Sequence, residues 1–106
     1  MKPVLINSNI LTQAWTCSGE ENVTAGKVIK DSPGLLHGLV VNTDGTNAVT
    51  VTVYDNASAT SGTIVAKITV LAADRTGGLI GIDVGCDNGI FVVINGTGGT
   101  AILYYE

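Results

Sequence analysis

The sequence has few charged side chains, and those it has are scattered. Charged residues make up 13% of the 106 residues, roughly half of the share usual in soluble domains. No basic cluster is available to neutralise phosphates or anionic lipid headgroups, because the five basic residues stand apart, at Lys2, Lys27, Lys30, Lys67 and Arg75. We therefore expect no direct binding of nucleic acid or of a membrane.

Long apolar runs are also missing. The run Val4-Leu5-Ile6 near the first residue is far shorter than a signal-peptide core or a membrane span of ~20 residues. We therefore expect the chain to be made and folded in a cytoplasm. Cys17 and Cys86 lack the spacing of a metal site. A disulfide between them is one alternative, and a reducing compartment favours two free thiols.

Groups that perform catalysis are equally scarce. His37 is the only histidine, and its apolar neighbours favour a hydrogen-bonded histidine within a sheet over a ligand or base. Ser32 and Ser58 have no nucleophile motif around them. The carboxylates fall mainly in turns, where aspartate typically accepts hydrogen bonds from backbone amides. The sequence predicts no enzyme, no cofactor and no bound metal.

What the sequence does contain is β-strand pattern. Residues Val49 to Asp55 alternate apolar and polar side chains, as expected of a strand with one dry and one wet face. Similar short segments recur, separated by turns rich in Gly, Asn and Asp. This spacing predicts an all-β chain with one antiparallel β-sandwich of about eight strands over residues 10–106, jelly-roll-like or immunoglobulin-like. Residues 1–9 are expected to form an N-terminal arm.

The turn signals set the limits of the expected strands. Residues 43–47, 85–89 and 96–99 are interpreted as loops of hairpins. Residues 18–22 are expected to turn, and residues 72–78 to form a loop with one helical turn. The predicted strands are Ile10–Cys17, Val23–Lys30, Leu35–Asn42, Val49–Tyr54, Thr63–Leu71, Leu79–Val84, Ile90–Ile94 and Thr100–Tyr105, the fifth assigned to strand rather than helix by its β-branched residues.

Two of these segments, Leu35–Val41 and Gly89–Ile94, are apolar on both faces. Alternation places Leu35, Leu39 and Val41 on one face of the first. The outer face of a sandwich normally meets water and is polar, so either a loop or another subunit covers these strands, and the low charge favours a subunit. The residues expected at an interface with another subunit or protein are Val4, Leu5, Ile6, Trp15, Phe91, Tyr104 and Tyr105.

Several segments resemble a group of small virion proteins of tailed bacteriophages. The first is Ser32–Asn42, a Pro-Gly turn followed by a strand that ends in Asn. The second is Val51–Ser58, with its Tyr-Asp-Asn turn, and the third is Asp87–Val93, which reads Asp-Asn-Gly-Ile-Phe-Val-Val. With the closing strand, the likeness spans about Ser32 to Tyr105.

This resemblance implies a structural role. Such proteins are commonly capsid decoration (cement) proteins, head fibres or tail components. It implies a homotrimer or other cyclic homo-oligomer, made in the host cytoplasm and located in the virion, where it binds the capsid or another virion protein and stabilises the assembled head. The alternative is a tail-fibre or carbohydrate-binding module that recognises a host surface glycan through Trp15, Tyr104 or Tyr105.

Overall fold

The structure, a computed structural model, describes residues 16–21 and 25–106, with side chains from residue 25 onward. Within these residues, no helix has the length and apolar character to cross a membrane. The elements are β1 (Thr16–Glu21), β2 (Lys27–Lys30), β3 (Gly34–Asn42), β4 (Val49–Asp55), β5 (Thr63–Val70), the 3₁₀ helix η1 (Ala72–Asp74), β6 (Thr76–Cys86), β7 (Ile90–Asn95) and β8 (Thr100–Tyr105).

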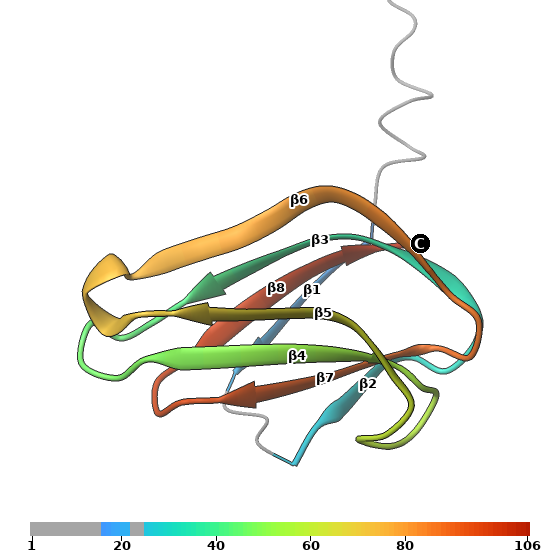
Figure 1. The fold of residues 1–106 in the computed structure, drawn as a ribbon, viewed down its shortest axis with the longest axis horizontal. Helices are drawn as coiled ribbons and strands as arrows, with labels where there is room; N and C mark the ends of the chain where they lie inside the picture. Colours follow the sequence, from blue (N-terminus) through green and yellow to red (C-terminus); the bar gives the residue numbers. More distant parts are fainter. Residues whose placement is uncertain (1–15, 22–24) are drawn as a thin grey trace, which may run out of the picture.

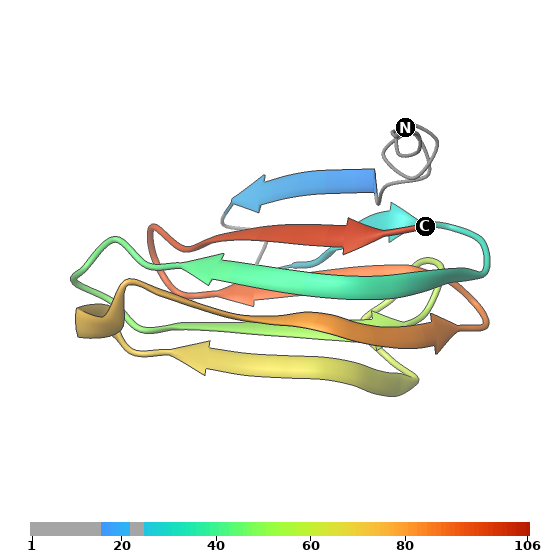
Figure 2. The same ribbon diagram turned by 90° about the horizontal axis from the view of Figure 1, so that it is seen from above.

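The strands form two antiparallel sheets that pack face to face (Figures 1 and 2). Sheet A has the order β1-β8-β3-β6, and sheet B has the order β2-β7-β4-β5. Successive strands therefore change sheet at every connection except β4 to β5. The predicted antiparallel β-sandwich is confirmed, and this strand order makes it a jelly roll rather than an immunoglobulin-like sandwich.

The hairpin interpretation of three loops is wrong. The connections at these loops, residues 43–48, 87–89 and 96–99, each carry the chain from one sheet to the other. Among the described strands, only the β4–β5 connection forms a hairpin whose strands pair directly. A local turn sequence reverses the chain in both cases. Whether the two strands then hydrogen-bond or face each other across the core is decided by their other neighbours, which the turn does not encode.

Two predicted turns belong to edge strands instead. Ser18 to Glu21 continue β1, because all of them pair with β8, and an edge strand tolerates charged residues. Residues 76–78 belong to β6, where a Cβ atom on Gly78 would lie 2.5 Å from the carbonyl oxygen of Leu39. The glycine therefore permits close pairing instead of marking a loop. The strand prediction for β5 and the helical turn at η1 are confirmed.

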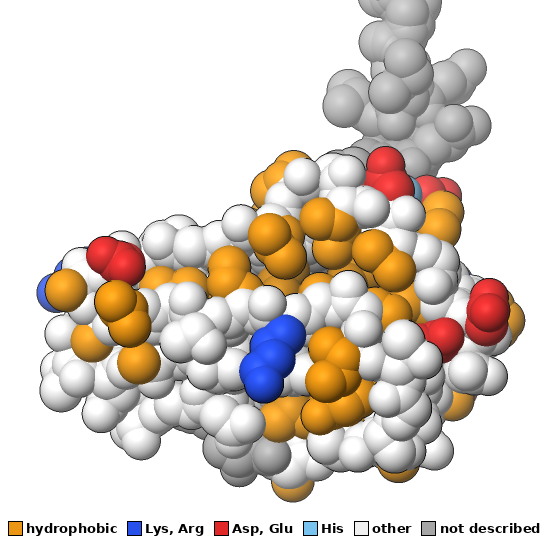
Figure 3. Space-filling view, viewed as in Figure 1, with side chains coloured by type: hydrophobic (Ala, Val, Ile, Leu, Met, Phe, Trp, Pro, Cys, Tyr) orange, Lys and Arg blue, Asp and Glu red, His pale blue; other side chains and the backbone are white. Residues whose placement is uncertain are grey.

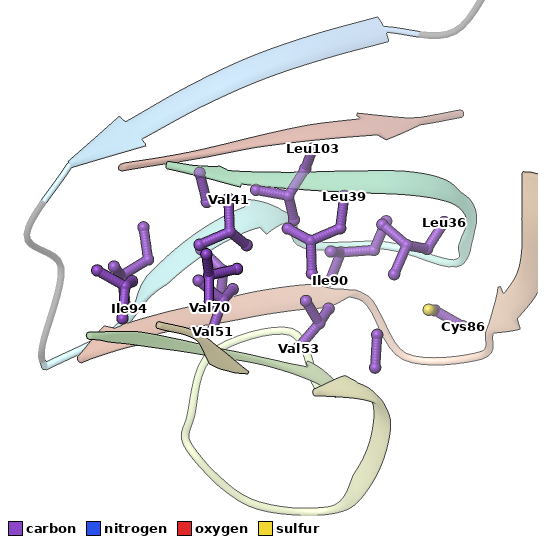
Figure 4. Close-up of a cluster of buried hydrophobic side chains, with 14 residues drawn as sticks. Leu36, Leu39, Val41, Val51, Val53, Val70, Cys86, Ile90, Ile94 and Leu103 are labelled. Carbon is purple, nitrogen blue, oxygen red and sulfur yellow. The ribbon is translucent and has the colours of Figure 1, made fainter. Parts of the chain in front are cut away.

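The core lies between the sheets, and its side chains come from both (Figure 4). In β3 it is Leu36, Leu39 and Val41 that are fully buried there, whereas alternation predicted Leu35 in place of Leu36. The reason is a bulge of β3 in its pairing with β8, where Leu36 pairs with Tyr105 and Gly38 with the adjacent Tyr104. A bulge adds one residue and shifts the alternation of all residues beyond it, and the added residue is His37.

Candidate functional site

His37 lies where sheet A is most irregular. Leu36 pairs with Val84, and Gly38 pairs with Ile80, so three residues of β6 oppose the single residue His37. The excess is accommodated by two left-handed backbone conformations in β6, at Gly81 (φ 76°) and Asp83 (φ 48°). Aspartate tolerates this region better than most residues. The double bulge brings the Asp83 carboxylate to the His37 ring.

The second partner of His37 comes from the end of β8. The backbone of Glu106 continues the ladder beyond Tyr105: its amide donates to the Leu35 carbonyl at 2.9 Å and its carbonyl accepts from the Leu35 amide at 3.0 Å. The Glu106 carboxylate then approaches His37 from the opposite side to Asp83. The distances are 2.6 Å from Nδ1 to Asp83 Oδ1 and 2.5 Å from Nε2 to Glu106 Oε2.

The two carboxylates determine the charge of this group. The His37 side chain is only 8% exposed, and burial alone would lower its pKa. Hydrogen bonds and negative charge from Asp83 and Glu106 outweigh that effect and raise the pKa of His37 above its usual 6.5. A protonated imidazole donates to both carboxylates, so the three side chains form an ionic clasp that joins β3, β6 and the end of β8.

This clasp is poorly suited to catalysis or metal binding. Both ring nitrogens of His37 face carboxylates, so neither is placed to take a proton from Ser32 or Ser58, or to bind an ion. In residues 16–21 and 25–106, no group of three His, Cys, Asp or Glu side chains could hold a metal. The predicted role of His37, a hydrogen-bonded histidine within a sheet, is confirmed. Its partners are 46 and 69 residues away, and no local signal marks them.

Other carboxylates fix connections between strands. Asp55, at the end of β4, accepts hydrogen bonds from the amides of Asp87 (3.1 Å) and Asn88 (2.8 Å). Asp44 accepts one from the amide of Thr46 at 2.8 Å. These backbone hydrogen bonds lower the pKa of both carboxyls below the usual 3.8. The expectation that turn aspartates bind backbone amides is thus correct, although Asp55 serves a connection distant in sequence.

Cys86 lies in the core and is a free thiol. Burial, followed by the negative charges of Asp55 and Asp87, raises its pKa. The expectation of a free thiol therefore holds for Cys86. Cys17 belongs to β1, whose side chains lie outside the described part of the structure.

The predicted interface residues occupy different environments. Phe91 is 5% exposed, and its ring lies against Gly26 at a place where a Cβ atom would collide with it. The chain before β2 therefore covers this aromatic ring, which leaves little of it for a partner. Tyr105 packs against the core, and Tyr104 is partly buried. The remaining four predicted residues, Val4, Leu5, Ile6 and Trp15, lie outside the described residues.

The middle of sheet A has an apolar outer face. Val40 pairs with Ile102, and Gly38 pairs with Tyr104. Their chain neighbours Leu39, Val41 and Leu103 fill the core, so alternation turns Val40, Ile102 and Tyr104 outward. We call these three residues the sheet A face. A sheet face that meets only water is normally polar, so this face is typical of a surface that another protein covers.

Comparisons with known proteins give no assignment. No protein-family model matches the chain, and no curated protein is detectably similar to it.

Proposed function

We propose that this protein is a structural component of a bacteriophage virion, and that it acts as a capsid decoration protein. The observation that carries the proposal is the sheet A face, where the half-buried side chains of Val40, Ile102 and Tyr104 point outward from the sheet. Jelly rolls occur in viral capsid proteins and also in lectins, so the fold alone does not choose a function. The apolar face favours a protein surface as the ligand.

The chemistry of the rest of the molecule agrees with a binding role. The clasp of His37, Asp83 and Glu106 joins strands and offers no free ring nitrogen, and Asp44 and Asp55 hold turns. Only 13% of the residues are charged. Covering the surface with another protein therefore removes few charged groups from water and costs little hydration free energy. A protein that binds only the assembled shell stabilises that shell by mass action.

Co-sedimentation tests the proposal. The purified protein is mixed with heads, and separately with tails, of the parent phage, and each mixture is run on a density gradient. We expect it to sediment with heads and not with tails. Ile102→Lys places a charge in the sheet A face and should abolish head binding, whereas Thr69→Lys, on the exposed outer side of β5, should leave binding unchanged.

The second candidate function, a tail-fibre or carbohydrate-binding module, gives the opposite results. It requires sedimentation with tails, or specific signals on a glycan array that disappear with Tyr104→Ala. Either result, or equal head binding by Ile102→Lys and the unchanged chain, would overturn the decoration role.

A further inference from the structure

The side of the sandwich formed by β5 and β6 exposes apolar residues next to the core. These two edge strands lie on the same side of the molecule (Figure 2). Viewed from that side, hydrophobic side chains form an almost continuous stripe (Figure 3). Six residues define this open edge: Ile64, at 49% exposed, and Ile80, at 61%, together with Val65, Ile68, Leu79 and Ile82, which are partly buried against the core.

The open edge carries almost no charge and has unpaired backbone groups. Lys67 and Asp83 are the only charged residues in the 8 residues of β5 and the 11 residues of β6, so the net charge of the two strands is zero. Each strand pairs on one side only. Before its bulge, the stretch Thr76–Ile80 pairs regularly with β3, which leaves its other side as a template for a further strand.

We propose that the open edge binds the open edge of a second copy of this chain, related by a two-fold axis. A two-fold interface brings the same patch together from both subunits, so that patch must complement itself. An apolar edge with zero net charge meets this condition, because burial favours contact and no net repulsion between the two edges opposes it. The net charge of −4 is carried elsewhere on the chain.

The size of the edge is sufficient for a stable dimer. A strand of 11 residues is about 36 Å long at ~3.3 Å per residue, and two sheets about 10 Å apart with their outer side chains are about 20 Å thick. The product is about 700 Å² per copy, which is close to the ~800 Å² per partner of a standard specific interface.

This dimer goes beyond the proposed function and does not depend on it. The open edge adjoins the sheet A face only at Ile80, which pairs with Gly38, whereas Ile64 belongs to the other sheet. Decoration of a capsid and pairing of two copies can therefore succeed or fail independently. The alternatives for the open edge are that residues 1–15 of the same chain cover it, or that a different protein does.

Sedimentation velocity of the full chain, from about 1 µM to about 1 mM, tests whether a second copy is the occupant. We expect a monomer–dimer equilibrium. Ile64→Lys should raise the dissociation constant of the dimer at least about tenfold. Each copy would then bring a further positive charge, in addition to Lys67, into the same interface.

Val28→Lys is the matched control. Val28, 38% exposed, lies in the same row across sheet B as Ile64, since Val28 pairs with Phe91, Phe91 with Tyr54, and Tyr54 with Ile64. It stands at the opposite edge of that sheet, and its substitution should leave the dissociation constant unchanged.

The stability of each variant is followed by thermal unfolding. Should Ile64→Lys unfold, Ile80→Lys serves as the second test, because its aliphatic stem can still cover Gly38, which Ile80 contacts closely. A monomer at all concentrations overturns the proposal, as does a trimer or an equal effect of Ile64→Lys and Val28→Lys.

Discussion

The two lateral edges of this jelly roll are built differently. On one side lie β1 and β2, of six and four residues, with two glutamates in the first and two lysines in the second. On the other lie β5 and β6, of eight and eleven residues, with one lysine and one aspartate between them. Short, charged edge strands are a common protection against unwanted strand pairing, and long, neutral ones lack it.

The few charged residues of the four edge strands are unevenly distributed between the two edges. Four of the ten residues at the β1–β2 edge are charged, against two of nineteen at the β5–β6 edge. The bulge at Gly81 and Asp83 gives β6 some protection near its end, but the stretch Thr76–Ile80 has none. An edge that lacks this protection along much of its length is expected to be covered in the working state of the protein.

The largest expected effect on stability tests whether β6 pairs closely with β3 at Gly78. Gly78→Ala places a Cβ atom 2.5 Å from the Leu39 carbonyl oxygen, whereas Gly85→Ala meets only the Leu35 side chain at 3.9 Å. We expect Gly78→Ala to lower the free energy of unfolding by about 2 kcal/mol, and Gly85→Ala to change it by less than about 0.5 kcal/mol. Urea denaturation measures both. Equal stabilities would mean that β6 does not pair closely at Gly78.

A smaller loss is expected where Asp55 fastens the β6–β7 connection to β4. Asp55→Ala leaves the amides of Asp87 and Asn88 without their acceptor and should cost about 1 kcal/mol. Because the folded pKa of Asp55 is lowered from 3.8, its contribution is present above pH 3.8 and disappears as the pH falls through the folded value. The stability difference between the unchanged chain and Asp55→Ala, measured by chemical denaturation, should shrink in that acidic range. A difference that persists there would contradict this assignment.

The clasp at His37 secures the bulged end of β6, and we expect His37→Gln to cost about 1 kcal/mol, because its carboxylate partners are largely exposed. The folded pKa of His37 lies above 6.5. Its contribution is therefore full below pH 6.5, while the carboxylates remain ionised, and is lost as the pH rises through the folded pKa.

The direction of this pH dependence is tested by measuring the free energy of unfolding of the unchanged chain and of His37→Gln from pH 5.5 to about pH 9. The two stabilities should converge as the pH rises. Asp83→Asn should reduce this pH dependence while leaving the bulge in place. Divergence toward high pH would contradict the clasp.

The sequence predicted the parts of this fold that depend on side-chain alternation. Apolar and polar residues alternate from Val49 to Val53, and the strand predicted there corresponds to β4. It did not predict which strands would pair, because a turn such as residues 96–99 serves a hairpin and a sheet-to-sheet connection equally. It also missed the bulge at His37, since a single added residue leaves the apolar pattern of β3 intact. The partners Asp83 and Glu106 depend on that bulge and on the register of β8 and β6, so they could be found only from the structure.

The smallest expected effect tests whether neutrality of the open edge favours self-association. Lys67→Glu changes the net charge of the β5–β6 edge from zero to −2, and each copy in the proposed dimer would carry this change. Association should weaken about two- to five-fold at low salt and recover as added salt screens the repulsion. Lys27→Glu makes the same change of charge on β2 at the opposite edge, so a dimer through the open edge should respond less to it. An equal response to the two substitutions at every ionic strength would show that total charge, not its position on one edge, governs how the copies meet.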